Sequence, residues 1–228
     1  MGKLQKADPA GIDLNLVADV AKQLAIESDR GSVVLGVAWM EEELTRLLKA
    51  RCLPSTKTDK GDELFGVSAP VGTFSAKTLL AWRLGLVSDE TKLKLDAFRK
   101  LRNEFAHLRN PITFSTPNIK DRIDHLFGLN LDISAGMWNV MLKSKDFAPV
   151  REKYKLSGGP EQLVKVLGPR SLIHFHICVV VAGLSYAADA ATTIKPSVRM
   201  RAVVGEIPRD GGASPSSSGS SRDTSDQG

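Results

Sequence analysis

The sequence predicts an all-α protein, organised as a single multi-helix bundle with a disordered C-terminal tail. Apolar residues recur at steps of three and four along most of the chain, which is the spacing of one helix face. With 42% hydrophobic and 25% charged residues in 228 positions, the chain is long enough for one medium domain with a core. After Val204 it turns to Gly, Ser, Pro and Asp and lacks the apolar residues that a core needs. We therefore expect a helical domain over residues 1–204 and a Gly/Ser-rich tail over residues 205–228.

Two long helices are expected at the start of the chain. Residues 12–26 carry apolar side chains on one face, and residues 31–51 follow after the capping residues Ser28 and Asp29. The apolar face of the second run consists of Val33, Val37, Met40, Leu44 and Leu47. Such dense spacing predicts the central, most heavily packed helix of the bundle.

Three shorter helices are expected next, over residues 74–84, from Ser88 to His107, and over residues 118–127. Gly85 ends the first of them, and Asn110-Pro111 stops the second. The predicted apolar face of the second consists of Leu93, Ala97, Phe98, Leu101, Phe105 and Leu108. Residues 128–159 show no clear helical period and stay unassigned.

The last apolar run predicts a short helix over residues 160–167 and a long one over residues 171–193. Residues 172–188 carry no formal charge apart from two histidines, but the run only reaches the lower length limit of a membrane span. It also contains Ser185 and Tyr186. We expect a buried bundle helix and no membrane partner; a helix held in a membrane is the alternative.

The composition favours a cytoplasmic protein. Cys52 and Cys178 lie far apart with no second cysteine near either, which predicts neither a disulfide framework nor a zinc knuckle. Residues 1–12 lack the apolar stretch of a signal peptide, so no export is expected. The net charge of +5 is spread among interleaved acids, and aromatic residues make up only 6%, which disfavours a base-stacking surface for single strands.

Two patterns are similar to ligand-binding motifs, but we expect both to be structural. His174 and His176 lie about 200° apart around a helix axis, so the two rings cannot hold one metal ion. Gly61, Gly66 and Gly72 lack the Gly-Lys-Ser/Thr ending of a phosphate-binding loop. We expect core or interface histidines, loop glycines, and neither a metal nor a cofactor.

Ala81, Gly85 and Ser88 are spaced as in the turn of a DNA-reading helix-turn-helix. The second helix of that motif would present Asp89 and Glu90 to the phosphate backbone, which repels carboxylates. We therefore expect an ordinary helical hairpin and regard direct DNA binding as disfavoured.

The strongest candidate for chemistry is the segment 102–107, RNEFAH. In a helix, Asn103 and His107 stack one turn apart, whereas Arg102 lies about 140° around the axis from His107. One straight helix cannot bring Arg102 and His107 together, so a working site would need a second surface or a symmetry mate. The alternative is structural: these side chains serve the helix C-terminus, or Arg102 pairs with a glutamate of residues 41–43.

Two blocks of the sequence resemble the mannitol operon repressor (MtlR) family. Residues 72–107, GTFSAKTLLAWRLGLVSDETKLKLDAFRKLRNEFAH, are similar to the signature block of that family, and residues 28–48, SDRGSVVLGVAWMEEELTRLL, to its earlier helix. The resemblance implies an all-helical protein without a standard DNA-binding motif. It also implies a link to transcriptional control of sugar-alcohol uptake, exerted through protein partners.

The run RNEFAH is also similar to the R-x4-6-H motif of HEPN domains, in which the motifs of two protomers form a composite, metal-independent ribonuclease site. Carried over, the motif positions are Arg102, Asn103 and His107. His107 would be the general acid or base on a ribose 2′-hydroxyl or the leaving oxygen, and Arg102 would stabilise charge on the phosphate. Many HEPN proteins are non-catalytic binding or regulatory modules.

We therefore expect a cytoplasmic helical regulatory protein of the mannitol-repressor type. It would form a homodimer and influence transcription through a protein partner. The alternative is a metal-independent HEPN-type endoribonuclease that acts on RNA, with Arg102 and His107 contributed by two chains. Neither function requires a cofactor, and the sequence leaves open whether the chain is an enzyme.

Overall fold

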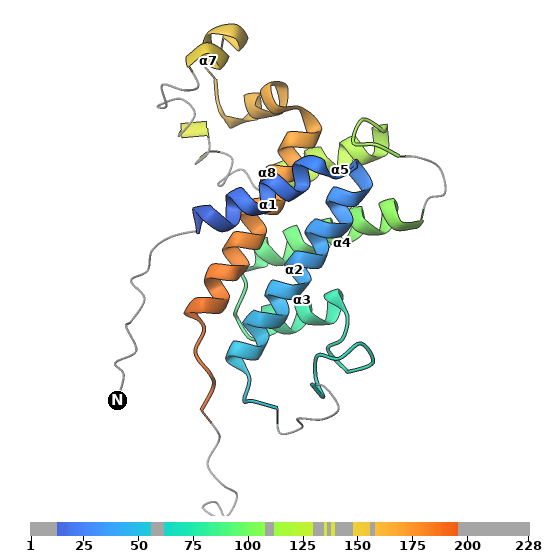
Figure 1. The fold of residues 1–228 in the computed structure, drawn as a ribbon, viewed down its shortest axis with the longest axis vertical. Coiled ribbons are helices and arrows are strands. Elements are labelled where there is room, and N and C mark those ends of the chain that lie inside the picture. Colours follow the sequence, from blue (N-terminus) through green and yellow to red (C-terminus); the bar gives the residue numbers. More distant parts are fainter. Residues whose placement is uncertain are drawn as a thin grey trace, which may run out of the picture. The chain divides into compact units, whose positions relative to one another are not determined.

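The secondary structure of the described residues is helical, as the sequence predicts. The structure is a computed structural model, and it describes residues 13–55, 62–107, 112–129, 135, 138–139, 148–155 and 158–195. Within these ranges every regular element is a helix (Figure 1). The all-α fold class is thereby confirmed. The predicted domain boundary after residue 204 and the tail over residues 205–228 lie outside the described residues.

The helices follow one another along the chain with connections of unequal length, the longest in its first half being residues 52–73. They are α1 (Leu14–Ile26), α2 (Asp29–Arg51), α3 (Phe74–Arg83), α4 (Asp89–His107), α5 (Pro117–Leu129), α7 (Ala148–Tyr154), a 3-10 turn (Pro160–Gln162) and α8 (Leu163–Ala190). Hydroxyl caps begin several of them: Gly31 N donates to Ser28 Oγ at 3.0 Å, and Ala76 N donates to Thr73 Oγ1 at 3.2 Å. The predicted bounds of the first five helices are confirmed to within a few residues.

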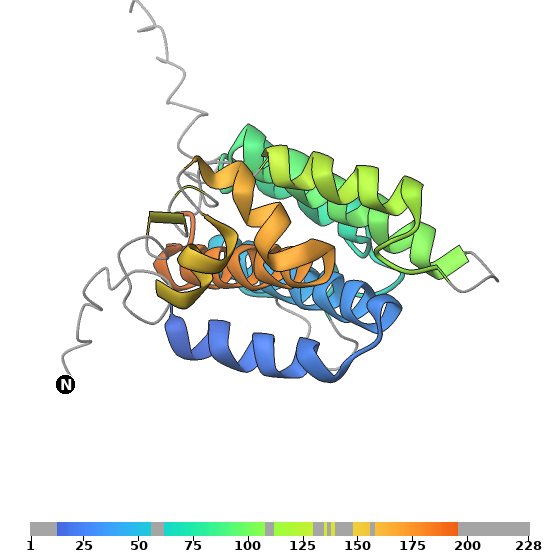
Figure 2. The same cartoon turned by 90° about the horizontal axis from the view of Figure 1, so that it is seen from above.

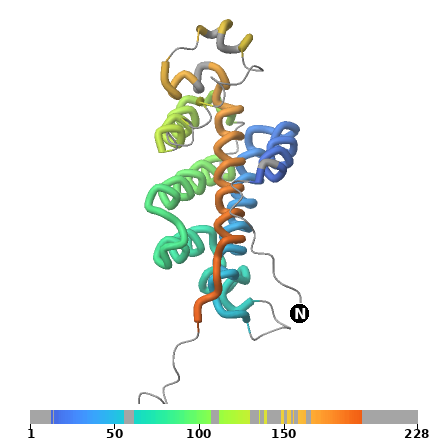
Figure 3. Tube along the Cα trace, turned by 90° about the vertical axis from the view of Figure 1, so that its left-hand side faces the viewer, coloured from blue at the N-terminus to red at the C-terminus, as the bar shows by residue number. Residues whose placement is uncertain are grey.

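The helices form three layers, with α2 and α8 in the middle (Figures 2 and 3). On one side, α1 packs mainly on α8 and less on α2. On the other side, α4 packs on α2, α3 and α5, and α5 also reaches α8. Because α2 and α8 touch helices of both outer layers, these two helices hold the bundle together.

The two central helices run parallel to each other. Their polar contacts join residues whose sequence separation stays between 139 and 143 from one end of α2 to the other. Asp29 is hydrogen-bonded to Arg170, Ser32 to His174, and Arg51 to Thr192. In an antiparallel pair the separation would fall steadily along the helix, so the near-constant value fixes the parallel direction.

A glycine allows the two central helices to approach closely. A Cβ atom built on Gly36 of α2 would lie 2.7 Å from Cδ1 and 2.8 Å from Cγ2 of Ile177 on α8. Real side chains do not come this close, so the fully buried Ile177 occupies the space that any other residue at position 36 would need. Val33 and Val37 are buried on either side.

Polar contacts link α2 and α8 at both ends of the pair. Near the start of α2, Arg170 donates to the Asp29 carboxylate and to the carbonyl oxygen of Glu27. Near its end, Arg46 donates to Asp189 and, at 2.6 Å, to Ser185 Oγ. These directional bonds oppose sliding of one helix along the other.

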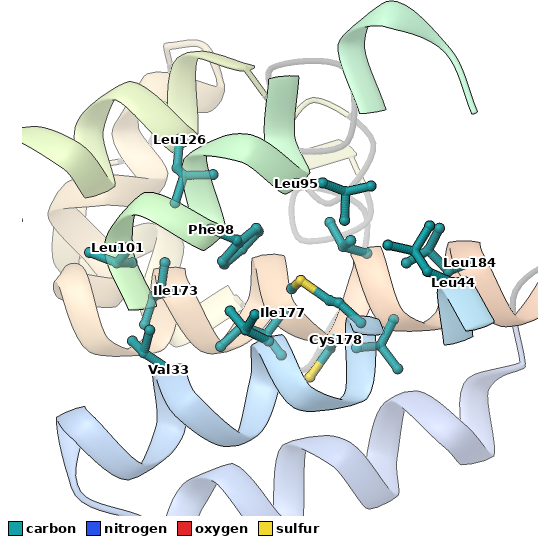
Figure 4. Packing of buried hydrophobic residues seen from close by; sticks show 14 of the residues in the cluster. Val33, Leu44, Leu95, Phe98, Leu101, Leu126, Ile173, Ile177, Cys178 and Leu184 are labelled. Carbon is teal, nitrogen blue, oxygen red and sulfur yellow. The ribbon is translucent and has the colours of Figure 1, made fainter. Parts of the chain in front are cut away.

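The core lies between the layers (Figure 4). The predicted face of α2 is confirmed, because all five of its residues are buried. Of the predicted face of α4, Leu93 was wrong, because it is 51% exposed and Leu95 is fully buried in its place, and Leu108 lies outside the described residues. Leu93 lies about 140° around the helix axis from the buried Phe98, whereas Leu95 lies only about 60° from it.

The C-terminal apolar run forms a kinked helix that is packed in the core. Gly168 has φ +68°, outside the helical range, and the following Pro169 restarts the helix, which agrees with the predicted division into two segments. Within the described residues, Val166–Ala190 is long and apolar enough to cross a membrane by length and composition, and an 18-residue window in it has a mean hydropathy of 1.7. Just over half of that window, 56%, is buried inside the protein.

Two glycine-to-alanine substitutions should change stability in opposite directions. Gly36→Ala should lower the free energy of unfolding by about 1–2 kcal/mol, because overpacking against Ile177 exceeds the gain in helix propensity. Gly183→Ala in α8, where a Cβ meets no atom within 4 Å, should raise it by about 0.5–1 kcal/mol. Urea unfolding of the two variants tests this, and equal effects would contradict the close approach at Gly36.

Candidate functional site

Helix α4 carries the segment singled out in the sequence. Thr91 N donates to Ser88 Oγ at 3.2 Å at the start of the helix, and the helix runs without a break to His107. Its inner face is formed by Leu95, Phe98, Leu101 and Phe105, all fully buried. The segment 102–107 is therefore the last part of a helix anchored along its whole length in the core.

Arg102 lies at the border of this buried face. It follows Phe98 by four residues and precedes Phe105 by three, so the three side chains share one side of the helix. The residue is half-buried, and its Nε atom is buried with no hydrogen-bond acceptor among the described residues. A buried arginine N–H without an acceptor costs free energy. No hydrogen bond at Nε among the described residues accounts for the burial of this guanidinium.

The backbone of α4 places Arg102 and His107 at positions on different sides of one continuous helix. Asn103 is half-buried one turn before His107, as predicted, because both belong to the continuous helix. The backbone of His107 ends α4, while its side chain lies outside the described part of the chain. The uninterrupted helix keeps Arg102 and His107 about 140° apart around the axis.

Two of the glutamates considered as partners of Arg102 are paired with other cations. Glu41 Oε1 accepts from Nζ of the buried Lys77 at 2.8 Å, and Glu43 Oε2 accepts from Arg46 Nε at 2.8 Å. On α4 itself, Glu104 accepts from Arg122 of α5 at 2.7 Å. Glu41 thus links α2 to α3, and Glu43 pairs within α2 itself.

The two histidines of α8 lie in the core, as expected from their spacing. His176 is fully buried beside the rings of Phe127 and Phe175, and His174 is half-buried with Nε2 at 2.9 Å from Ser32 Oγ. Burial, and to a lesser extent the positive charge of Lys94, lower the pKa of His176 to about 4. Burial and the nearby Arg170 also lower the pKa of His174, against the opposite effect of Asp29.

A polar cluster around Asp29 was not predicted from the sequence beyond its role as a cap. One carboxylate oxygen accepts from Arg170, and the other accepts from Phe114 N at 2.8 Å, in the segment between α4 and α5. The Phe114 ring packs edge-on against both Phe105 and His174. The cluster therefore ties the end of α4 to the central pair of helices.

The other sequence patterns serve local structure. The N–H groups of Gly66, Ala69 and Gly72 donate to the carbonyls of Asp62, Gly66 and Ala69, so they are used inside the loop; Gly61 lies outside the described residues.

Between α3 and α4, Gly85 has φ +67°, Leu86 N donates to the carbonyl of the buried Ala81, and Trp82 donates to Asp89. These contacts close an ordinary helical hairpin, as expected. Asp89 accepts a hydrogen bond from Trp82 inside the hairpin, and the first turn of α4 carries the acidic residues Asp89 and Glu90.

Sequence reasoning also missed two surface hollows among the described residues. One, of about 150 Å³, lies at the end of α2 around Cys52 and Phe65. The other, of about 200 Å³, lies between α1 and α2 and is bordered by Trp39 and Glu42. The signal for the second was a tryptophan beside three glutamates on a helix that we expected to be packed on all sides. Within the described ranges no group of three or more His, Cys, Asp or Glu side chains is placed to hold a metal ion.

Comparison with known proteins gives one structural similarity. No family profile matches the chain, and no curated protein sequence matches it. The chain aligns with the X-ray structure of the MtlR-HPr complex from Escherichia coli, with 16% identity and a TM-score of 0.49. The alignment covers 75% of this chain and 99% of that chain. We draw neither a function nor a partner from a similarity at this TM-score, and the proposals below rest on the residues of the chain itself.

The buried His176 should make stability depend on pH. Its pKa is about 4 in the folded protein against 6.5 for an ordinary histidine, so the unfolded chain binds a proton that the folded chain does not bind between these values. The free energy of unfolding should therefore fall as the pH falls through this window, by roughly 3 kcal/mol. Urea unfolding at several pH values between 7 and 4.5 measures the loss.

His176→Leu should remove most of this pH dependence, whatever its effect on stability at pH 7. The matched control is His125→Gln, at an exposed position of α5, which should leave the pH dependence unchanged. An unaltered slope in His176→Leu would contradict the assignment.

Proposed function

We propose that this chain is a cytoplasmic helical regulatory protein of the mannitol-repressor type that acts by binding a protein partner and thereby influences transcription. Residues 28–48 and 72–107 support the proposal by their resemblance to that family. They form α2 and the α3–α4 hairpin, which are core elements of the bundle. The proposal includes a homodimer, as the resemblance to composite HEPN assemblies implies.

The placement of Arg102 is the observation that carries the non-catalytic part of the proposal. A general acid or base and the group that stabilises the phosphate charge must reach one reacting centre. Arg102 borders the buried face of α4 and stays about 140° around the helix from His107. In a single copy of the chain the two positions therefore lie on different sides of α4, and a joint site would require a second copy.

A metal-independent endoribonuclease is the second candidate, because Arg102 Nε has no acceptor within the described part of the protein. Catalysis would require two chains. Arg102 would stabilise the phosphate, Asn103 would lie beside it, and His107 of the other copy would transfer the proton to or from the 2′-hydroxyl or the leaving oxygen.

Incubation of the full chain with labelled total RNA in excess EDTA separates the two functions. A binding protein should leave the RNA intact, and Arg102→Ala and His107→Ala should behave like the wild type. Arg99→Ala, another partly buried arginine of α4, serves as the matched control. Cleavage by wild type and Arg99→Ala, with 2′,3′-cyclic phosphate ends and no cleavage by the other two variants, would overturn the proposal in favour of the enzyme.

A further inference from the structure

A groove runs between α1 and α2 above one residue of α8. It is lined by Leu16, Asp19, Val20 and Gln23 of α1, by Trp39, Glu42 and Glu43 of α2, and by Val181 of α8. The lining positions of α1 and α2 recur at steps of three and four, so each helix presents one continuous face to the groove. The groove has a volume of about 200 Å³.

The floor of the groove is apolar. Val20 and Val181 are almost completely buried, at 4% and 2% exposure, while Leu16 and Trp39 are half-buried. The groove exists because α1 packs mainly on α8, which leaves the facing side of α2 incompletely covered. Because Val20 and Val181 are already buried, the apolar area that a partner would remove from water belongs mainly to Leu16 and Trp39, and its burial is favourable.

The rim of the groove is acidic. Asp19, Glu42 and Glu43 contribute three carboxylates, and the residues that line the groove include neither lysine nor arginine. Lys22 and Arg46 pair with Asp19 and Glu43 from outside the lining, both at exposed positions. With Lys22 and Arg46 counted, the rim carries a net charge of −1, whereas the chain as a whole carries +5.

The volume and the negative charge of the groove limit the class of molecule that can bind in it. Pockets for small organic ligands usually have volumes of roughly 300–1,000 Å³, and this groove is smaller than that range. A nucleic acid would bring its phosphates against the three carboxylates and be repelled. Two rows of side chains, one from each helix, over an apolar floor instead match the way an amphipathic helix is bound, through apolar residues at helical spacing.

We propose that this groove is the docking site for a basic amphipathic helix of the partner protein. Apolar side chains of that helix contact Leu16, Val20 and Trp39, and its lysines or arginines pair with Asp19 and Glu42. The inference rests on the proposed function, because it names the site and the chemical class of the protein partner. Both features, apolar anchors and opposite charge, are required for selective binding.

A labelled helical peptide with leucines on one side and lysines on the other provides the probe, and fluorescence anisotropy measures its binding to the full chain. Glu42→Lys should weaken binding at least about tenfold, because the exposed Glu42 carboxylate becomes a repelling cation. Glu90→Lys makes the same charge change at an exposed site on α4 and should leave binding within about twofold. Added salt should weaken wild-type binding.

A charge swap tests the contact directly. The same peptide with glutamates in place of the lysines should bind wild type poorly and gain affinity for Glu42→Lys. Trp39→Ala should weaken binding of the basic peptide while leaving the helix content of the protein unchanged. Equal weakening by Glu42→Lys and Glu90→Lys, or no gain in the swap, would overturn the proposal.

Other occupants give distinct results. If Glu42→Lys changes the oligomeric state of the protein alone in sedimentation experiments, a second copy covers the groove and the proposal fails. If removal of the charges of Lys195, Arg199 and Arg201 strongly increases peptide affinity, a segment of this chain competes for the groove, and the proposal also fails. RNA cleavage would overturn the proposed function without affecting the peptide result, so the two failures are distinguishable.

Discussion

The packing of α2 against α8 is the contact on which the other helices depend. Gly36 lets Ile177 lie against the α2 backbone, and polar contacts at both ends, Asp29 with Arg170 and Arg46 with Asp189, hold the register. Because the two helices are parallel, the chain must return to its starting end between them. The segment from α3 to α5 makes that return and forms one outer layer, which is how α4 comes to lie on α2.

This arrangement of the helices determines where the candidate functional residues lie. The C-terminal part of α4 is fixed against the core by Phe98 and Phe105, and this places Arg102 at the border of the buried face. On the opposite side, α1 packs mainly on α8 and leaves part of α2 accessible beside Trp39 and Glu42. The candidate catalytic residues thus belong to α4 in one outer layer, while the proposed docking groove lies on the side of α1.

Local features of the fold were predictable from the sequence, and distant contacts were not. The helical period and the caps at Ser28 and Ser88 placed helices in the first half of the chain, because both signals act within a few residues. The face of α4 was misplaced at Leu93, since an alternative leucine two residues later fits the same period better. The parallel direction of α8 and the bonds of Asp29 to Phe114 and Arg170 join residues 85 to 143 positions apart, which no local pattern encodes.

Distances between spin labels test the parallel pairing most directly. In a background with Cys52→Ser and Cys178→Ala, one label at the exposed Ser171 of α8 is combined with a second label at Arg30 or at Lys49 of α2. The parallel pair predicts a short distance from Ser171 to Arg30 and a distance to Lys49 that is longer by roughly 20–30 Å, since 19 residues of helix separate the two α2 positions. A shorter distance to Lys49 than to Arg30 would contradict the parallel pair and, with it, the placement of α4 and of the groove.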